Sequence, residues 1–193
     1  MKAKYNIYLV ILILITSCNS NHVPKPRGYF RIDTPEKEYR DLAADYPFSF
    51  QYPVYAEIRK YQAHGNEKED VSNWFNLDFP DFKAQLYITY KPVEQNLRQL
   101  IEDSHSFVYK HVGMADAINQ TEYKDDQSSV SGVLFDIKGN TASSIQFYLT
   151  DSTSSFLRGA LYFDCEPNKD SLAPLISFLR EDIEYLMETF TWK

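Results

Sequence analysis

Three segments near the end of the chain alternate between apolar and polar residues, and this alternation limits the fold more than any other feature. The segments span residues 130–138, 143–150 and 156–164. Successive side chains of a strand point to opposite faces of a sheet, so the alternation predicts half-buried strands. Short turns join them, whereas parallel strands need a long crossover. The sequence therefore predicts an antiparallel meander.

Four earlier segments also have the composition and alternation of strands. Pro80 and Asp81 separate the last two and predict a hairpin turn between them. The four segments span residues 46–52, 54–59, 73–79 and 82–90. Together with the meander, they predict about seven strands.

Two stretches repeat apolar residues at helical spacing and predict amphipathic helices. Asn96 is the expected N-cap of the first helix, with Gln99 completing a capping box, and Gly113 is the expected stop. Asp170 or Ser171 is the expected cap of the second helix. The apolar stripes comprise Leu97, Leu100, Ile101, Ser104, Val108 and Val112 in the first helix, and Leu172, Leu175, Ile176, Leu179, Ile183, Leu186, Met187 and Phe190 in the second.

The acidic residues of the second helix, Glu181, Asp182 and Glu184, are expected to lie away from the centre of its buried stripe. Strands and helices together predict an α+β fold, in which helices pack on a single antiparallel sheet of about seven strands.

The first 17 residues predict a cleaved lipoprotein signal peptide. Lys2 and Lys4 precede an apolar run that is too short to span a membrane, which takes roughly 20 residues. The run ends in Ile15-Thr16-Ser17-Cys18, which resembles the bacterial lipobox. In that class of signals the cysteine thiol receives a diacylglycerol, and the new amino end is then acylated, with palmitate expected here. Cys18 is therefore the expected lipidation site and membrane anchor.

After the leader, residues 18–45 are expected to form the lipidated cysteine and an extended tether, and residues 46–193 a single α+β domain. Lys25 and Arg27 follow the lipid closely and could contact anionic headgroups. Candidate contacts with a protein partner are Lys25, Arg27, Tyr29 and Trp74.

Composition excludes some classes of function. The chain has 27 Asp and Glu against 20 Lys and Arg, a formal net charge of −7, and nucleic-acid binding needs a basic face. Besides Cys18 the chain has one cysteine, Cys165, so no disulfide is expected. Cys165 closes an apolar strand and is expected to be buried.

No arrangement of residues in the sequence identifies a catalytic centre, so no enzymatic activity, metal or cofactor is expected. His105 and His111 would point about 240° apart on a helix, unlike a pair of zinc ligands. Convergence of Asp151, Ser152 and His105 into a hydrolytic site is a minor hypothesis, because Asp and Ser residues more often satisfy the backbone of a turn.

The chain is rich in aromatic residues, with 15 Tyr, 13 Phe and 2 Trp. Rings can fill a core or form a glycan-binding surface, so a cell-wall or glycan-binding module, including a degenerate hydrolase, is the alternative function. That alternative requires rings such as Trp74 and Tyr29 to be exposed along one cleft.

Several short motifs of the chain are specific in combination through their order and spacing, among them PKPRGY, WFNLDFP and FLRGALYF. The motifs occupy residues 24–29, 74–80, 87–91, 102–105, 110–111, 139–140, 146–147, 149–152, 156–163, 167–168, 170–172, 182–183 and 192–193. Through these motifs the chain resembles, from residue 24 onward, the gliding-motility lipoprotein GldD family of Bacteroidota. The strand order is also similar to that of PsbP-like domains, through residues 46–53.

The resemblance implies a role in gliding, a process linked in these bacteria to type IX secretion, and it implies no reaction and no catalytic residues. Surface lipoproteins of this phylum often carry acidic residues just after the cysteine. Residues 19–22 carry none, which favours a periplasm-facing position on either membrane. The segments beginning at Asp151 and Asp170 resemble the phylum's O-glycosylation signal, so Ser152 and Ser171 are candidates for modification or for turn and cap roles.

The leading hypothesis is thus a lipid-anchored accessory protein, not an enzyme, that assembles or braces the gliding and secretion apparatus. Its expected partners are the membrane, through Cys18, and protein components of that machinery.

Overall fold

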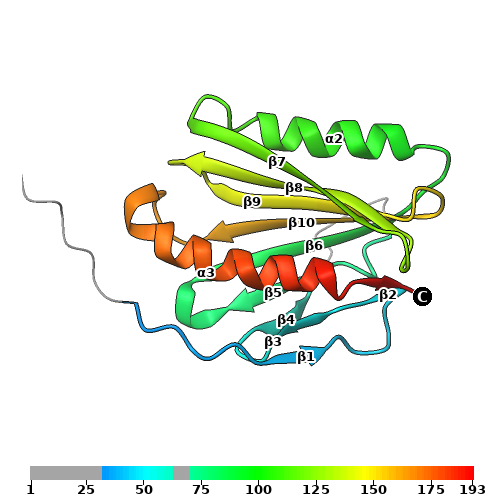
Figure 1. The fold of residues 1–193 in the computed structure, drawn as a ribbon, viewed down its shortest axis with the longest axis horizontal. Helices are drawn as coiled ribbons and strands as arrows, with labels where there is room; N and C mark the ends of the chain where they lie inside the picture. The colour runs from blue at the N-terminus through cyan, green and yellow to red at the C-terminus, as the bar shows by residue number, and fades with distance from the viewer. Residues whose placement is uncertain (1–31, 63–69) are drawn as a thin grey trace, which may run out of the picture. The chain divides into compact units, whose positions relative to one another are not determined.

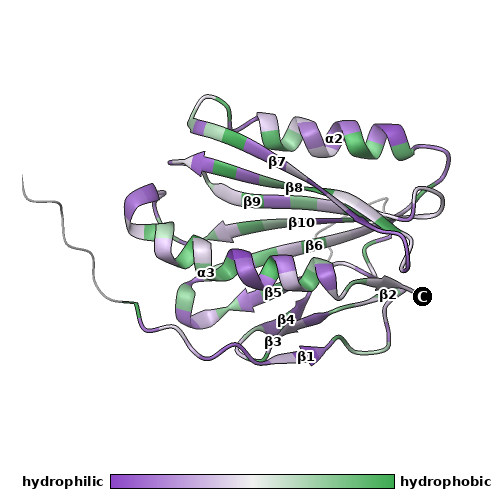
Figure 2. Ribbon diagram, viewed as in Figure 1, coloured by the Kyte–Doolittle hydropathy of each residue, from purple (hydrophilic) through white to green (hydrophobic). Residues whose placement is uncertain are grey.

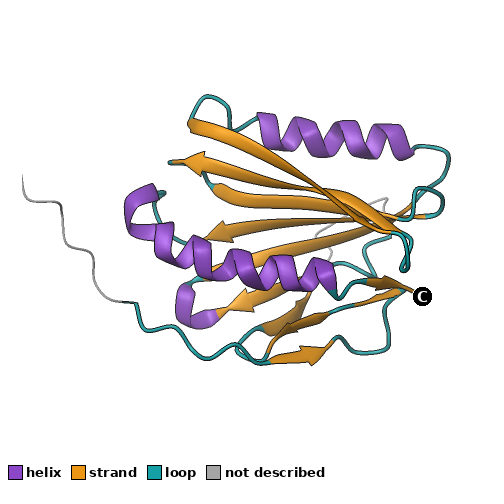
Figure 3. Ribbon diagram, viewed as in Figure 1, coloured by secondary structure: helices purple, strands orange, loops and turns teal. Residues whose placement is uncertain are grey.

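The structure, a computed structural model, describes residues 32–62 and 70–193. Figures 1 and 3 show two α-helices against a large sheet in this part of the chain. The strands are β1 (Tyr39–Asp41), β2 (Phe48–Ser49), β3 (Gln51–Pro53), β4 (Glu57–Lys60), β5 (Phe75–Phe79), β6 (Ala84–Pro92), β7 (Ala115–Asp125), β8 (Val130–Gly139), β9 (Ser143–Thr150), β10 (Ser155–Phe163) and β11 (Thr191–Trp192). The helices are the 3₁₀ helix η1 (Pro80–Phe82), α2 (Leu97–Tyr109) and α3 (Lys169–Glu188).

Seven strands form one antiparallel sheet in the order β4-β5-β6-β10-β9-β8-β7. The predicted α+β fold is therefore confirmed, as are the hairpin between β5 and β6 and the meander of β8, β9 and β10. Two small sheets, β1 with β3 and β2 with β11, hold the early strands and the chain end.

Strand β9 is buried along its whole length. Its residues Phe147 and Leu149 belong to the larger core cluster, which includes the buried face of α3. The residue between them, Tyr148, belongs to a second cluster with the buried face of α2. Neighbouring residues of a strand point to opposite faces, so α2 and α3 cover opposite faces of the sheet at β9 (Figure 1).

Both helices are amphipathic as predicted, and hydrophobic and hydrophilic residues alternate along them in Figure 2. The cap predicted for α3 is wrong, because the cap is Asn168, whose side chain accepts a hydrogen bond from the Ser171 backbone N–H at 3.2 Å. Asn96 is the N-cap of α2 as predicted, but its side chain accepts from the Glu94 backbone N–H at 2.9 Å and caps no helical N–H. Asx side chains satisfy turns as readily as helix ends, which explains why Asn96 bonds the turn before α2.

The seven strands of the large sheet differ in one member from the predicted set. Residues 46–52 were expected in it, but β2 and β3 pair with β11 and β1. Strand β7 takes the seventh place at the sheet edge and was not predicted, because most of its side chains are exposed. The sequence of an exposed edge strand rich in polar residues shows no alternation of apolar and polar residues.

Two further positions differ from expectation. Strand β1 lies upstream of residue 46, where the sequence placed the start of the domain, and it pairs with β3 through Arg40 opposite Tyr52. Three residues are too few for a periodic pattern to be detected. Cys165 is exposed, not buried, since β10 ends two residues before it, at Phe163.

The Phe147 ring lies against Gly159 of β10, and this contact yields a test of core packing. A Cβ at Gly159 would lie 2.1 Å from the Phe147 ring, whereas a Cβ at Gly113 would meet nothing within 4 Å. We expect Gly159→Ala to lower the free energy of unfolding by roughly 2 kcal/mol through overpacking. Gly113→Ala is the matched control and should stay near wild type in urea unfolding. Equal midpoints for the two variants would contradict the packing.

Candidate functional site

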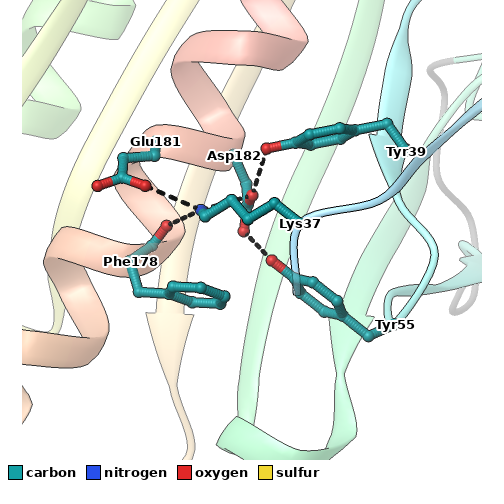
Figure 4. A network of polar contacts seen from close by, with 6 residues as sticks. All are labelled: Lys37, Tyr39, Tyr55, Phe178, Glu181 and Asp182. Atoms are coloured by element: carbon teal, nitrogen blue, oxygen red, sulfur yellow. Dashed lines mark hydrogen bonds and ion pairs between the residues drawn. The ribbon is translucent and has the colours of Figure 1, made fainter. Parts of the chain in front are cut away.

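The carboxylate of Asp182, in the middle of α3, is buried and accepts hydrogen bonds from three side chains far away in the sequence (Figure 4). Lys37 Nζ donates to its Oδ1 at 2.8 Å, and the Tyr39 hydroxyl donates to the same oxygen at 2.9 Å. The Tyr55 hydroxyl donates to Oδ2. We call Lys37, Tyr39, Tyr55 and Asp182 the Asp182 cluster.

Lys37 is held by more than one carboxylate. Its ammonium donates to the Phe178 backbone carbonyl at 2.6 Å and lies 3.9 Å from the centroid of the Phe178 ring. It also lies 3.3 Å from Glu181, whose side chain is 64% exposed. A buried carboxylate needs such partners, because desolvation of an unpaired charge is costly. The Asp182 cluster therefore joins Lys37 and Tyr39, which lie within the expected tether, to the C-terminal helix.

Burial, and then the hydrogen bond and charge of Asp182, raise the pKa values of Tyr39 and Tyr55 above their ordinary value. Both hydroxyls thus stay protonated as donors to the carboxylate. Asp182 was predicted to lie away from the centre of the buried stripe, but only 2% of the residue is exposed, so the sequence did not predict its burial. Its partners are 127 to 145 residues away, so no local pattern could reveal them.

A groove lies on the α2 side of the sheet, over strands that α2 does not cover. Its volume is about 420 Å³. A second hollow of about 210 Å³ continues it toward Phe107 of α2 and shares Trp74, Thr89 and Arg158 with it. We call the two hollows together the Arg158 groove. Its open part is lined by Tyr61, Trp74, Asn76, Tyr87, Thr89, Arg158 and Tyr162.

Arg158 is the charged residue shared by both hollows. Its guanidinium donates to Gln146 Oε1 at 2.6 Å, lies 4.6 Å from the centroid of the Phe107 ring and interacts with the Tyr162 hydroxyl. Among the described residues it forms no ion pair with a carboxylate. Burial lowers the pKa of Arg158, and burial and the nearby Arg158 lower that of His111.

The Asp151, Ser152 and His105 hypothesis gains nothing from the structure. Asp151 accepts hydrogen bonds from the backbone N–H groups of Thr153, Ser154 and Ser155 at 2.8–2.9 Å. Burial alone would raise the Asp151 pKa, but these bonds and one from the Ser154 hydroxyl outweigh it and lower the pKa to about 2. His105 packs edge-on against Phe135, with ring centroids 5.1 Å apart. Asp151 is thus engaged by its own turn.

The two candidate modification sites lie at exposed positions. Ser152 occupies the tip of the β9–β10 turn with a left-handed φ of 66°, and Ser171 is in the first turn of α3. Four other candidates, Cys18, Lys25, Arg27 and Tyr29, fall outside the described residues, as does the expected signal peptide.

Trp74 is the predicted contact residue that the structure describes. Its indole N–H donates to the Tyr90 carbonyl at 2.7 Å, and its ring lies 5.5 Å from that of Tyr61. Most other rings fill the core, including Phe48, Phe50 and Phe75. The sequence thus identified one ring of the groove but missed Arg158, whose place between apolar strand residues resembles that of any outward-facing cation.

Two features are absent from residues 32–62 and 70–193, a metal-binding cluster and a membrane-spanning helix. No group of three or more His, Cys, Asp or Glu side chains gathers there as a metal site would require. No helix in those ranges has the length and apolar character needed to cross a membrane.

Comparison with known proteins identifies the family. A family model described as gliding motility lipoprotein GldD matches residues 19–192. The chain belongs to the gliding motility lipoprotein GldD family. The resemblance found in the sequence is therefore confirmed, and membership associates the chain with the cell envelope and with gliding motility. A search of curated proteins finds no match.

In this GldD family member the Asp182 cluster makes a direct stability prediction. Asp182→Asn removes the charge that Lys37 and the two tyrosines share, so we expect a loss of about 3 kcal/mol in the free energy of unfolding. Amide hydrogen exchange of β1 should accelerate more than that of β9. Glu181→Gln alters an exposed neighbour and should change stability by less than about 1 kcal/mol. Indistinguishable unfolding curves for the two variants would disprove the role of Asp182.

The same cluster predicts a loss of stability in alkali. The folded pKa values of Tyr39 and Tyr55 are raised, so the folded state keeps protons that the unfolded state loses above about pH 10. This contribution to stability is complete below pH 10 and is lost as pH rises further. Between pH 8 and pH 11, wild type should lose more stability in denaturant titrations than Tyr55→Phe. An equal loss in both proteins would show that Tyr55 does not contribute.

Proposed function

We propose that the protein is a lipid-anchored accessory component of the gliding machinery, which assembles or braces the gliding and type IX secretion apparatus without catalysing a reaction. Membership of the gliding motility lipoprotein GldD family supports the process. The lipobox ending in Cys18 supports cleavage of residues 1–17 and acylation of the cysteine, for which several acyl chains give stable anchoring.

The Asp182 cluster is the observation that most favours bracing. An anchored brace must transmit force from its lipid to its folded part. Lys37 lies 19 residues after Cys18 in the sequence. In the structure its ammonium donates a hydrogen bond to the buried carboxylate of Asp182 in α3. Force applied through the tether would therefore be resisted first by the C-terminal helix and the core packed against it, and only then by the short strand β1.

We place the domain in the periplasm, since residues 19–22 carry no acidic residue. Lys25 and Arg27 lie close to Cys18 in the sequence and would meet anionic headgroups, at about 1 kcal/mol per cation. Tyr29 follows them and is a candidate contact with a protein of the machinery.

Lipidation is tested with the two cysteines of the chain. We expect Cys18→Ala to abolish palmitate labelling, to remove the protein from the membrane fraction or leave it unprocessed, and to stop gliding. Cys165→Ala is the matched control, because Cys165 is exposed and lies outside the lipobox, and it should retain all three properties. Gliding at wild-type speed in the Cys18→Ala strain, at equal protein level, would refute the anchoring part of the proposal.

Chemical crosslinking and affinity purification from the same two strains identify the proteins that bind the lipoprotein. Recovery of gliding or secretion components with Cys165→Ala but not with Cys18→Ala is expected of an anchored assembly factor. Equal recovery from both strains would mean that assembly does not depend on the lipid.

A further inference from the structure

The guanidinium of Arg158 forms no ion pair with a carboxylate among the described residues. The chain has more acidic than basic residues, yet no Asp or Glu of the described residues lines the open part of the groove. Asp103 lines the smaller hollow, where its carboxylate accepts a hydrogen bond from the Gln99 amide at 2.8 Å. A hollow on the other side of the sheet differs: there Arg180 pairs with Asp136 at 2.8 Å and Lys169 with Asp116 at 2.5 Å. A partly buried guanidinium without an anion is costly, and an anionic group entering the groove would remove that cost.

The side-chain amide of Gln146, next to Arg158, has a donor without an acceptor. Gln146 is 1% exposed, and its Nε2 has no hydrogen-bond partner among the described residues. Its orientation is fixed, because Oε1 accepts from the Arg158 guanidinium, and the flipped amide would place donor against donor. The local surplus of donors over acceptors therefore favours an oxygen-rich anion, and a guanidinium binds the two oxygens of a carboxylate well.

The rest of the groove consists of rings and small polar side chains. The Trp74 indole N–H is occupied by the Tyr90 carbonyl, so the ring offers only its carbon surface. Tyr87 is 39% exposed and meets the Tyr162 ring edge to face at 5.3 Å. Asn76 and Thr89 lie between the two pairs of rings. A pyranose has apolar C–H faces and a rim of hydroxyl groups, and this lining complements both.

We propose that the Arg158 groove binds a saccharide that carries a carboxylate. Arg158 holds the carboxylate, the rings of Trp74 and Tyr87 stack on the sugar faces, and Asn76 and Thr89 bond hydroxyl groups. A peptide would engage Arg158 only through a side-chain or C-terminal carboxylate, whereas the partly exposed polar side chains Asn76 and Thr89 favour a ligand with several hydroxyl groups. The site is independent of the lipid anchor.

Two sources could supply this chemistry, namely wall glycan whose muramic acid is free of peptide and a polysaccharide that contains uronic acid. The experiment is isothermal titration calorimetry on the full mature lipoprotein in detergent. The probes are a peptide-free oligomer of N-acetylglucosamine and N-acetylmuramic acid, an oligoglucuronide and a neutral chitin oligomer of equal length. We expect one acidic probe to bind at least about tenfold more tightly than the neutral one, and the preferred acidic probe identifies the source.

Variants then test the assigned residues. Arg158→Gln should weaken binding of the acidic probe by about tenfold or more and leave the neutral probe unchanged, whereas Tyr87→Ala should weaken both. Arg180→Gln, which removes a paired arginine on the other side of the sheet, should weaken neither. Tyr87 is exposed, so its variant keeps the test valid if Arg158→Gln does not fold.

Three results would overturn the proposal. These are no measurable binding of either acidic probe at millimolar concentration, equal binding of acidic and neutral probes, and wild-type affinity in folded Arg158→Gln. Tight binding of a peptide with a free carboxylate, in the absence of saccharide binding, would assign the groove to a protein partner and also reject the saccharide.

Discussion

The burial of β9 on both faces is the constraint on which the rest of the fold depends. Every residue of this strand is buried, so a layer must cover each side of the sheet there. Helix α2 supplies one layer and α3 the other, through separate core clusters. The close fit of the Phe147 ring to Gly159 shows how little space remains between β9 and β10 on the α3 side.

Helix width explains why one face of the sheet stays partly open. A helix is about 10 Å wide and covers about two strands, whereas seven strands extend over roughly 29 Å. On the α3 side, the core is extended beyond the helix by Phe48 of β2, Tyr52 of β3 and Phe50 between these two strands. On the α2 side, no described element takes that place over β5 and β6, and the Arg158 groove lies there. The topology of the sheet thus leaves the groove open, and the side chains that line it determine which ligand it can bind.

The sequence predicted the parts of the fold that depend on local pattern. The meander, the β5–β6 hairpin and both amphipathic stripes repeat at spacings that a single segment reveals. Strand β7 escaped because an edge strand buries little. The burial of Asp182 escaped because its charge argued for the surface, and the partners that make burial possible, such as Tyr39, are brought close only by the folded chain. Contacts between segments that are distant in the sequence produce no periodic pattern, so they could not be predicted from this single sequence.

Functional features, too, could be predicted from the sequence only where they form a local motif. The lipobox and the family motifs are local and could be identified from the sequence. Arg158 is distinguished only in the folded chain, where it forms no ion pair among the described residues and lies beside the Gln146 amide. The structure also separates the two features spatially: Asp182 belongs to the helix that covers one face of the sheet, and Arg158 faces the other. A ligand in the groove and a load on the tether would therefore act on different faces of one sheet. That arrangement suits a protein that must be held at a membrane while one of its faces remains available.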